Sequence, residues 1–282
     1  MEERYYCIAG IRYRICCPKE WMYGGDYHLT NFRTEPGPWD HSIHFSVEET
    51  LPAPTGEQMV DQPSLAVYRQ ADTLVIYEGG RDPYLRLQWS GNETQATARR
   101  ACIPGRITIK LVLAALFLTK KLIRQGGFML HSSYICHDGK AILFTAPSGT
   151  GKSTQADLWG TLRGAKLLNG DRACVMSTPE GVMVHGVPFS GSSGVSENVS
   201  APLAAIVYLS QAPVTTITRL TGLRAFRSVW EGCSVDLWDR AETTACTDLV
   251  LEVIRQVPVF HLACTPDESA VNAVERAILE LR

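Results

Sequence analysis

The feature that most constrains this 282-residue chain is the run of residues 141–154, AILFTAPSGTGKST. Its first five residues are apolar or β-branched and predict a strand, and residues 155–159 continue as a helix after the glycine loop. In such a loop, at the start of a helix, backbone N–H groups point at a common anion. The segment therefore predicts α/β structure built around a phosphate site.

The loop also carries the side chains that a nucleotide needs. Lys152 can reach the β and γ phosphates, and the Ser153 hydroxyl can bind Mg²⁺. The usual pattern has a glycine where Ala146 stands, which removes one permissive backbone position but no phosphate-binding side chain. The alternative is a glycine turn without a ligand, which has no need of the Lys-Ser pair. We expect ATP with Mg²⁺ to bind at Ser148, Gly149, Thr150, Gly151, Lys152, Ser153 and Thr154.

Charge and hydropathy argue against nucleic-acid and membrane partners. The formal net charge is −2, and the basic residues are scattered in no run longer than a pair. Residues 107–123 are strongly apolar, but the stretch is shorter than the ~20 residues of a bilayer span. It also contains Lys110. A buried helix is favoured over a membrane span.

The cysteines and the amino terminus indicate a cytoplasmic protein. The nine cysteines contain no Cys-x-x-Cys pair and no His/Cys metal-ligand spacing, which suits reduced thiols. Residues 1–5 are acidic and lack the basic start and apolar stretch of an export signal.

Two domains are expected. Residues 1–103 contain short runs of alternating apolar and polar residues separated by turns, which predict an antiparallel β-rich domain. Residues 104–282 hold the phosphate loop, alternate helix and strand, and begin with a linking helix at 106–125. The predicted fold class is α+β, with an N-terminal β region followed by an α/β nucleotide-binding core.

A predicted hairpin aims His131 at the phosphate loop. Asp138-Gly139 is a preferred pair for a two-residue turn between strands at 128–136 and 140–146. If the turn occupies these two residues, 137 faces 140, and the same register sets His131 opposite Ala146. A register shifted by one residue would instead leave the histidine in the sheet or at a helix interface.

Asp171 is expected at the same edge. The helix from Lys152 ends at Gly164, and a short strand at 165–168 leads into Asn169-Gly170-Asp171. A right-handed crossover makes this strand parallel to the strand before the loop, and often its neighbour, so Asp171 returns to the phosphates. There a carboxylate can bind Mg²⁺ or accept a proton from an incoming hydroxyl. The alternative is an ordinary aspartate in a turn.

Together, His131, the loop at 146–154 and Asn169-Gly170-Asp171 resemble the successive motifs of the HPr kinase and phosphoenolpyruvate carboxykinase superfamily, especially its HPr kinase-like branch. The resemblance covers about residues 125–200. It implies a P-loop α/β core of that type, with His131 as a phosphate-side or acid-base residue. It further implies that Lys152 and Ser153 bind phosphate and Mg²⁺, and that Asp171 is the base. Because small members of this branch occur in peptide-modification pathways, a peptide substrate is implied as one option.

The chain departs from the family at two points. Gly170-Asp171 stands where HPr kinases commonly have two adjacent acids, and their glycine-arginine signature segment has no counterpart. Three further residues are candidate contacts to substrate or phosphate: Arg172, beside Asp171, and His185 and Ser190, in a strand and the loop of small residues that follows it. For His185 and Ser190, an ordinary connecting loop explains the pattern equally well.

We therefore expect a kinase that transfers the γ-phosphoryl group of ATP to a hydroxyl. The expected acceptor is a serine of a peptide or protein, or a small molecule. A homo-oligomer is compatible with the sequence. Asp171, His131 and Lys152 are the expected catalytic residues. The alternative function is a non-catalytic nucleotide-binding accessory protein that presents its β region to a partner.

Overall fold

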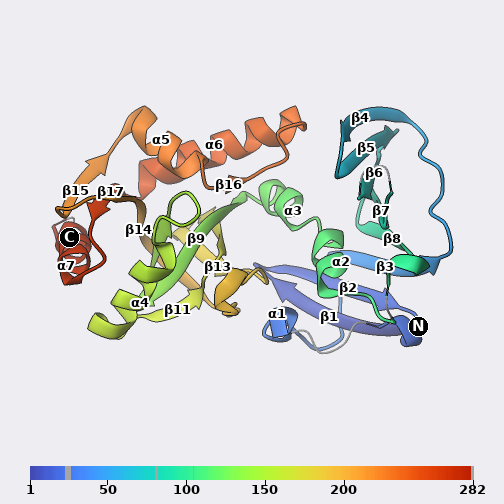
Figure 1. Cartoon of the computed structure of the whole chain (residues 1–282), viewed down its shortest axis with the longest axis horizontal. Coiled ribbons are helices and arrows are strands. Elements are labelled where there is room, and N and C mark those ends of the chain that lie inside the picture. The colour runs from blue at the N-terminus through green and yellow to red at the C-terminus, as the bar shows by residue number, and fades with distance from the viewer. Residues whose placement is uncertain (23–26, 80–81, 104, 281–282) are drawn as a thin grey trace. The chain divides into compact units, whose positions relative to one another are not determined.

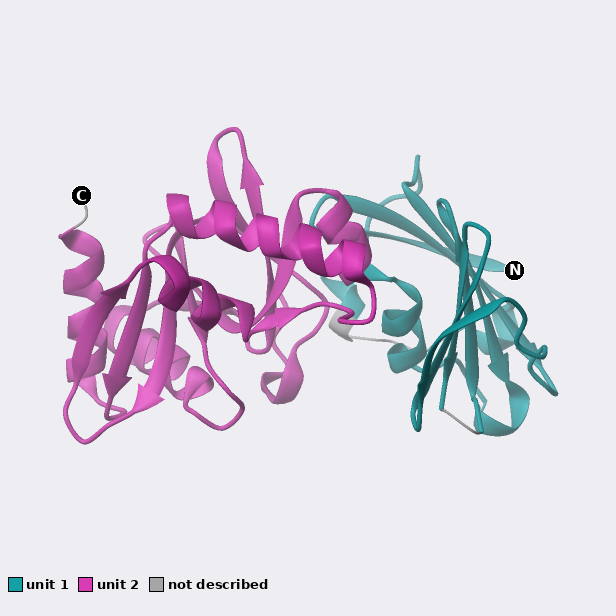
Figure 2. Ribbon diagram, turned by 90° about the horizontal axis from the view of Figure 1, so that it is seen from above, with its two compact units in different colours: residues 1–118 teal, residues 119–282 magenta. Residues whose placement is uncertain are grey.

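The structure, a computed structural model, describes residues 1–22, 27–79, 82–103 and 105–280. It divides into two compact units, Met1–Leu118 and Thr119–Arg282 (Figure 2). Residue 104, where the sequence places the domain boundary, lies outside the described residues; the division between units comes later, after Leu118. Both units are mixed helix and sheet, each with one large sheet.

The first unit contains an eight-stranded sheet in the order β1-β2-β3-β8-β7-β6-β5-β4. Its strands are β1 Glu2–Ile8, β2 Ile11–Cys17, β3 His41–Glu48, β4 Glu57–Gln62, β5 Leu65–Gln70, β6 Thr73–Glu78, β7 Leu85–Ser90 and β8 Glu93–Arg99. The short helices η1 Lys19–Trp21 and α1 Tyr27–Thr30 lie between β2 and β3, and η2 Arg100–Cys102 follows β8.

The expectation of a wholly antiparallel region is wrong at β3. This strand pairs in parallel with β2 on one side and with β8 on the other. The connection that carries η1 and α1 brings the chain back to the start of β2 before β3 begins. At that point the Arg12 N–H donates to the Asp40 carboxylate over 2.7 Å, and the Asp40 N–H donates to the Arg12 carbonyl over 2.9 Å. These bonds set the parallel register.

The single linking helix expected at 106–125 is also corrected, because two helices replace it. These are α2 Ile109–Ala115 and α3 Leu118–Arg124. Between them, Phe117 has a left-handed backbone with φ of 48°, which ends α2, and its buried ring stacks on Trp89 at 5.0 Å. No helix within the described residues is long and apolar enough to cross a membrane.

The second unit contains a nine-stranded sheet whose main path is β10-β9-β12-β13-β14-β17-β15, with β11 and β16 paired to β9. Its strands are β9 Gly127–His137, β10 Lys140–Thr145, β11 Lys166–Asn169, β12 Arg172–Thr178, β13 Gly181–Gly186, β14 Ser200–Gln211, β15 Thr216–Leu220, β16 Cys233–Ser234 and β17 Val259–Cys264. Its helices after α3 are α4 Lys152–Arg163, η3 Gly191–Ser193, α5 Gly222–Trp230, α6 Arg240–Gln256 and α7 Glu268–Leu279.

Consecutive residues of each strand point to opposite faces of the sheet. Both faces of this sheet carry buried apolar residues, and helices cover both. On one face, Phe144 of β10 and Val207 of β14 pack with Trp159 of α4 and with residues of α7. On the other face, Leu143 and Ile206 belong to the cluster that includes α5 and α6. Figure 1 shows α5 and α6 along one side of the strands and α4 along the other.

The hairpin between β9 and β10 has the predicted register. Lys140 pairs with His137 and the ladder continues to Thr145 opposite Ser132, so the next pair in line is Ala146 and His131. Asp138 and Gly139 both have positive φ, as a two-residue turn of this kind requires. The predicted crossover strand, β11, runs in the same direction as β10 but is not its neighbour. Both strands are antiparallel to β9, and β9 lies between them.

One buried ionic cluster ties α3 to the start of α6. Lys120, with 6% of its side chain exposed, forms ion pairs with Asp236 at 3.0 Å, with Asp239 at 3.4 Å and with Glu242. Asp239 also caps α6 by accepting from the Glu242 N–H over 3.2 Å. Burial raises the pKa of Glu242, and the Lys120 ammonium opposes that rise.

We predict that Lys120→Met destabilises the second unit by about 3 kcal/mol at pH 8, because it leaves the buried Glu242 carboxylate without its cation. The pKa of Glu242 then rises further, so the loss should shrink as the pH falls and the carboxyl group is protonated. Urea unfolding at pH 8 and pH 5 measures both effects. Lys166→Met, at an exposed lysine of β11, is the matched control. Equal stability of the two variants at pH 8 would contradict the prediction.

Candidate active site

The phosphate loop joins β10 to α4 and is open to solvent. Gly149 and Gly151 have φ of 78° and 119°, and a Cβ at either position would meet nothing within 4 Å. Glycine is therefore required here for its backbone conformation and not for space. Ala146 is buried and is not among the residues with positive φ, so its position does not call for the glycine of the usual pattern. Ser148, Ser153 and Thr154 are exposed.

Lys152 is the first residue of α4, and its side chain turns back along the loop. Its Nζ donates to the carbonyl oxygens of Ala146 at 3.0 Å and Pro147 at 3.4 Å. The residue is only 8% exposed. Burial lowers the pKa of Lys152, while the Asp171 carboxylate acts to raise it. The lysine therefore lies inside the loop and within the electrostatic field of Asp171.

His131 and Asp171 meet beside this loop. The His131 Nε2 lies 3.5 Å from Asp171 Oδ1. Two backbone bonds fix them: the His131 N–H donates to the Gly232 carbonyl over 2.7 Å, and the Ser132 N–H donates to the Asp171 carbonyl over 3.0 Å. The Thr145 hydroxyl, at the end of β10, donates to the His131 carbonyl over 2.9 Å. The histidine is thus held between the end of β10, the segment before β16 and the start of β12.

The surroundings of His131 favour the neutral form of its imidazole. Burial lowers the pKa of the ring, and Lys152 and Arg172 lower it further, while Asp171 raises it. The contacts of Asp171 with His131 at 3.5 Å and with Arg172 at 3.3 Å bring these three side chains together, and Lys152 lies near enough to act on the ring. A neutral imidazole can donate or accept a hydrogen bond, and its protonation responds to any change in the surrounding charge.

Asp171 follows β11 in a turn that Asn169 organises. The buried Asn169 side chain accepts from the Asp171 N–H over 2.9 Å and donates to the Val187 carbonyl over 2.8 Å. A Cβ on Gly191 would come within 2.9 Å of the Asp171 Cβ, so the backbone of that loop lies directly against the aspartate. The small-residue loop after β13 therefore forms one wall of the site.

Arg172 is held beside the aspartate by partners that the sequence did not reveal. Its Nε donates to Asp171 Oδ2 over 3.3 Å, and its Nη1 donates to the Ser234 hydroxyl over 3.1 Å. The guanidinium lies 5.3 Å from the centre of the Phe189 ring. Ser234 and Phe189 are far from Arg172 in the sequence and belong to no motif, so only the fold brings them to the site.

The two remaining candidate contacts differ in placement. Ser190 is buried at the start of η3, directly before Gly191 and therefore beside Asp171. His185 lies on β13 and hydrogen-bonds through Nδ1 with the Ser200 hydroxyl at 2.7 Å. Among the described contacts none joins His185 to His131 or Asp171. Its predicted role at the acceptor remains a prediction.

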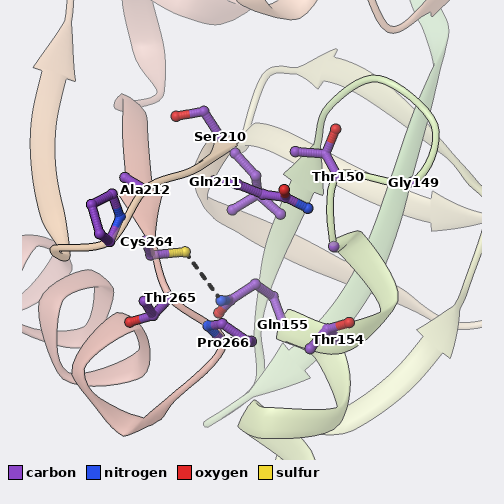
Figure 3. A pocket seen from close by; sticks show the side chains of 13 residues that line it. Gly149, Thr150, Thr154, Gln155, Ser210, Gln211, Ala212, Cys264, Thr265 and Pro266 are labelled. Atoms are coloured by element: carbon purple, nitrogen blue, oxygen red, sulfur yellow. Dashed lines mark hydrogen bonds between the residues drawn. The ribbon is translucent and has the colours of Figure 1, made fainter.

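A pocket of about 610 Å³ opens on the other side of the phosphate loop (Figure 3). Gly149, Thr150, Gly151 and Thr154 form one wall, and the chain after β14 and after β17 forms the opposite wall. Gln155 and Cys264 meet at its base, where the Gln155 Nε2 donates to the Cys264 Sγ over 3.4 Å. Cys264 is largely buried and also lines this pocket.

The donors for a metal ion are limited to a few oxygens. Within the described residues, no group of three or more His, Cys, Asp and Glu side chains is arranged to hold a metal. Mg²⁺ in nucleotide sites is commonly held by one or two protein oxygens together with phosphate oxygens and water. Ser153, exposed at the start of α4, and Asp171 fit that donor set.

Residues 105–280 match the sequence profile of the family described as "SynChlorMet cassette protein ScmC". The match spans well over half of the chain. The chain belongs to the ScmC family. The matched region contains the phosphate loop, His131, Asp171 and Arg172, so the whole candidate site lies in the part of the chain that defines the ScmC family.

No functionally curated protein matches this ScmC family member. Among solved structures, it is similar to the Hpr(Ser) kinase/phosphatase from Coxiella burnetii. The identity is 12%, the TM-score is 0.30, and the match covers 54% of this chain and 92% of that chain. A likeness this distant does not bear on fold or activity. We therefore infer the function of the ScmC chain from its own residues.

We predict opposite shifts of the His131 pKa in two variants. Asp171→Asn removes the carboxylate that raises this pKa and should lower it, whereas Lys152→Met removes a neighbour that lowers it and should raise it. NMR titration of the His131 ring protons measures both shifts. Lys140→Met, at the exposed start of β10, is the control and should leave the His131 titration unchanged. Shifts in the same direction in both variants would show that the three side chains do not share one site.

Proposed function

We propose that this protein is a kinase that transfers the γ-phosphoryl group of ATP to a hydroxyl group. The observation that carries the proposal is that the His131–Asp171 pair lies next to the phosphate loop and Lys152. His131 Nε2 lies 3.5 Å from Asp171, and Lys152 acts electrostatically on both. A phosphate-binding loop beside a carboxylate and a neutral imidazole has the groups that phosphoryl transfer to a hydroxyl requires.

In this mechanism Asp171 is the base. It orients the acceptor hydroxyl and takes its proton, while the acceptor oxygen forms a bond to the γ-phosphorus. The bond between that phosphorus and the bridging oxygen breaks, and ADP leaves. The loop at Gly191 and the Arg172–Phe189 contact limit the directions from which the acceptor reaches Asp171.

Lys152 and His131 act on the phosphate side. When phosphates occupy the loop, their oxygens offer Lys152 Nζ stronger acceptors than the Ala146 and Pro147 carbonyls that it contacts here. His131, whose surroundings favour the neutral ring, donates a hydrogen bond and gains a proton more readily as negative charge accumulates beside it. Mg²⁺, with Ser153 and Asp171 as its protein ligands, would neutralise part of the phosphate charge.

The acceptor class remains that predicted from the sequence, a serine of a peptide or protein or a small molecule. The motifs at His131, the loop and Asp171 resemble those of HPr kinase-like proteins, and that resemblance implies a peptide as one possible substrate. We place the reaction in the cytoplasm, where ATP is available and cysteines stay reduced.

A second function, nucleotide binding without transfer, is favoured by one observation. Both oxygens of the Asp171 carboxylate are engaged, one by His131 at 3.5 Å and the other by Arg172 at 3.3 Å. Each oxygen keeps a second lone pair, but the two contacts leave fewer directions from which an acceptor hydroxyl can reach the carboxylate. An accessory protein that uses ATP only as a structural ligand does not need that access.

We predict that Asp171→Asn keeps nucleotide binding and loses transfer by a factor of about 10² to 10⁴, because the amide cannot accept the proton. The acceptor is first found by incubating the wild type with γ-labelled ATP and lysate from its own source. Transfer to the identified acceptor and ATP affinity are then measured for each variant. Asp157→Asn, at an exposed aspartate of α4, is the matched control and should behave as wild type.

The outcomes separate the two functions. Binding with no consumption of ATP in any lysate would overturn the kinase and leave the accessory protein. Full transfer by Asp171→Asn would show that another group is the base.

A further inference from the structure

We propose that the pocket lined by Gln155, Gln211 and Cys264 binds the nucleoside half of the substrate and selects adenine over guanine. The Gln155 side-chain oxygen accepts the hydrogen bond of the exocyclic amine. This inference rests on the proposed nucleotide substrate and deepens it, since the phosphate loop alone does not distinguish one base from another.

The pocket is continuous with the phosphate loop. Gly149, Thr150, Gly151 and Thr154 line it and also belong to the loop that would hold the phosphates. Its volume of about 610 Å³ lies within the range typical of small-molecule sites. A triphosphate on the loop can therefore extend into the pocket without leaving the second unit.

The distribution of charge fixes which way the nucleotide lies. The residues lining the pocket include no Asp, Glu, Lys, Arg or His. The ionisable groups of His131, Asp171 and Arg172 gather on the other side of Lys152. An uncharged base and ribose suit the neutral pocket, which leaves the γ-phosphate toward the charged groups.

Gln155 provides the specific contact. The residue is 2% exposed, its Nε2 is engaged with Cys264, and its Oε1 has no hydrogen-bond partner among the described residues. A buried acceptor without a partner is costly, and a turn of the Gln155 side chain toward the pocket would let an amine donor satisfy it. Burial raises the pKa of Cys264, which keeps the thiol protonated and uncharged. At position 6 of the purine ring adenine carries an amine donor, whereas guanine carries a carbonyl oxygen, which the Gln155 oxygen repels.

Apolar atoms complete the binding surface. Leu209, Ala212 and Pro266 line the pocket alongside the polar groups, and Figure 3 shows Ala212 and Pro266 across the pocket from Thr150. A flat aromatic base gains contact area from such walls.

The test measures binding of ATP, GTP and inorganic tripolyphosphate, each with Mg²⁺, by isothermal titration calorimetry. Gln155→Leu removes the acceptor, and Ala212→Trp fills the pocket from a partly exposed position. Gln256→Leu, at an exposed glutamine of α6, is the matched control. Thermal unfolding shows that each variant is folded. Gln155→Leu should unfold at no lower temperature than the control, since it removes a buried unpaired oxygen.

The expected result is tighter binding of ATP than of GTP by the wild type. Gln155→Leu should weaken ATP binding about tenfold and remove the preference, while tripolyphosphate affinity stays unchanged. Ala212→Trp should likewise weaken ATP and leave tripolyphosphate unaffected. If both variants bind ATP as tightly as the wild type, or if the wild type binds ATP and GTP equally, the pocket assignment is wrong. The nucleotide proposal is unaffected by that result. Failure of both ATP and tripolyphosphate to bind overturns the nucleotide proposal and the pocket with it.

Discussion

Two hydrogen bonds from neighbouring residues of β9 hold the candidate site together. Successive N–H groups of a strand point to opposite edges, so His131 bonds to Gly232 on one edge and Ser132 bonds to Asp171 on the other. The same strand pairs with β10, which leads into the phosphate loop. A hairpin, a crossover and the segment before β16 are thereby brought to one point. β9 pairs with both β10 and β11, and it therefore fixes the position of Asp171 relative to the loop.

Charge then divides this site into two parts. On one side of Lys152 the imidazole of His131 lies between a carboxylate and two cations, and its pKa responds to each of them. On the other side, the described residues that line the pocket at Gln155 are uncharged, and among the described residues the Gln155 oxygen has no hydrogen-bond partner. A substrate with a charged end and an uncharged end fits this division in a single orientation. Under the proposed function, the chemistry and the recognition of the base depend on different residues, which mutation can separate.

The sequence predicted the parts of this arrangement that local chemistry determines. Asp138-Gly139 favours a two-residue turn, and the structure has the register that this turn predicts, with His131 next in line opposite Ala146. The parallel strand β3 and the break at Phe117 were not predictable, because the first depends on a distant Arg12–Asp40 contact and the second on stacking with Trp89. The contacts of Arg172 and Gln155 were not predictable for the same reason. Ser234, Phe189 and Cys264 meet them only through long-range pairing of strands.

A crystal structure with Mg²⁺ and a non-hydrolysable ATP analogue tests the central claim most directly, which is that β9 assembles one phosphoryl-transfer site from the loop, His131 and Asp171. We predict the γ-phosphate beside Lys152 Nζ, with the His131 ring within a direct or single-water hydrogen bond of it and Asp171 facing the open side of the phosphorus. A nucleotide on the loop whose γ-phosphate lies further than one bridging water from both His131 and Asp171 would contradict the account.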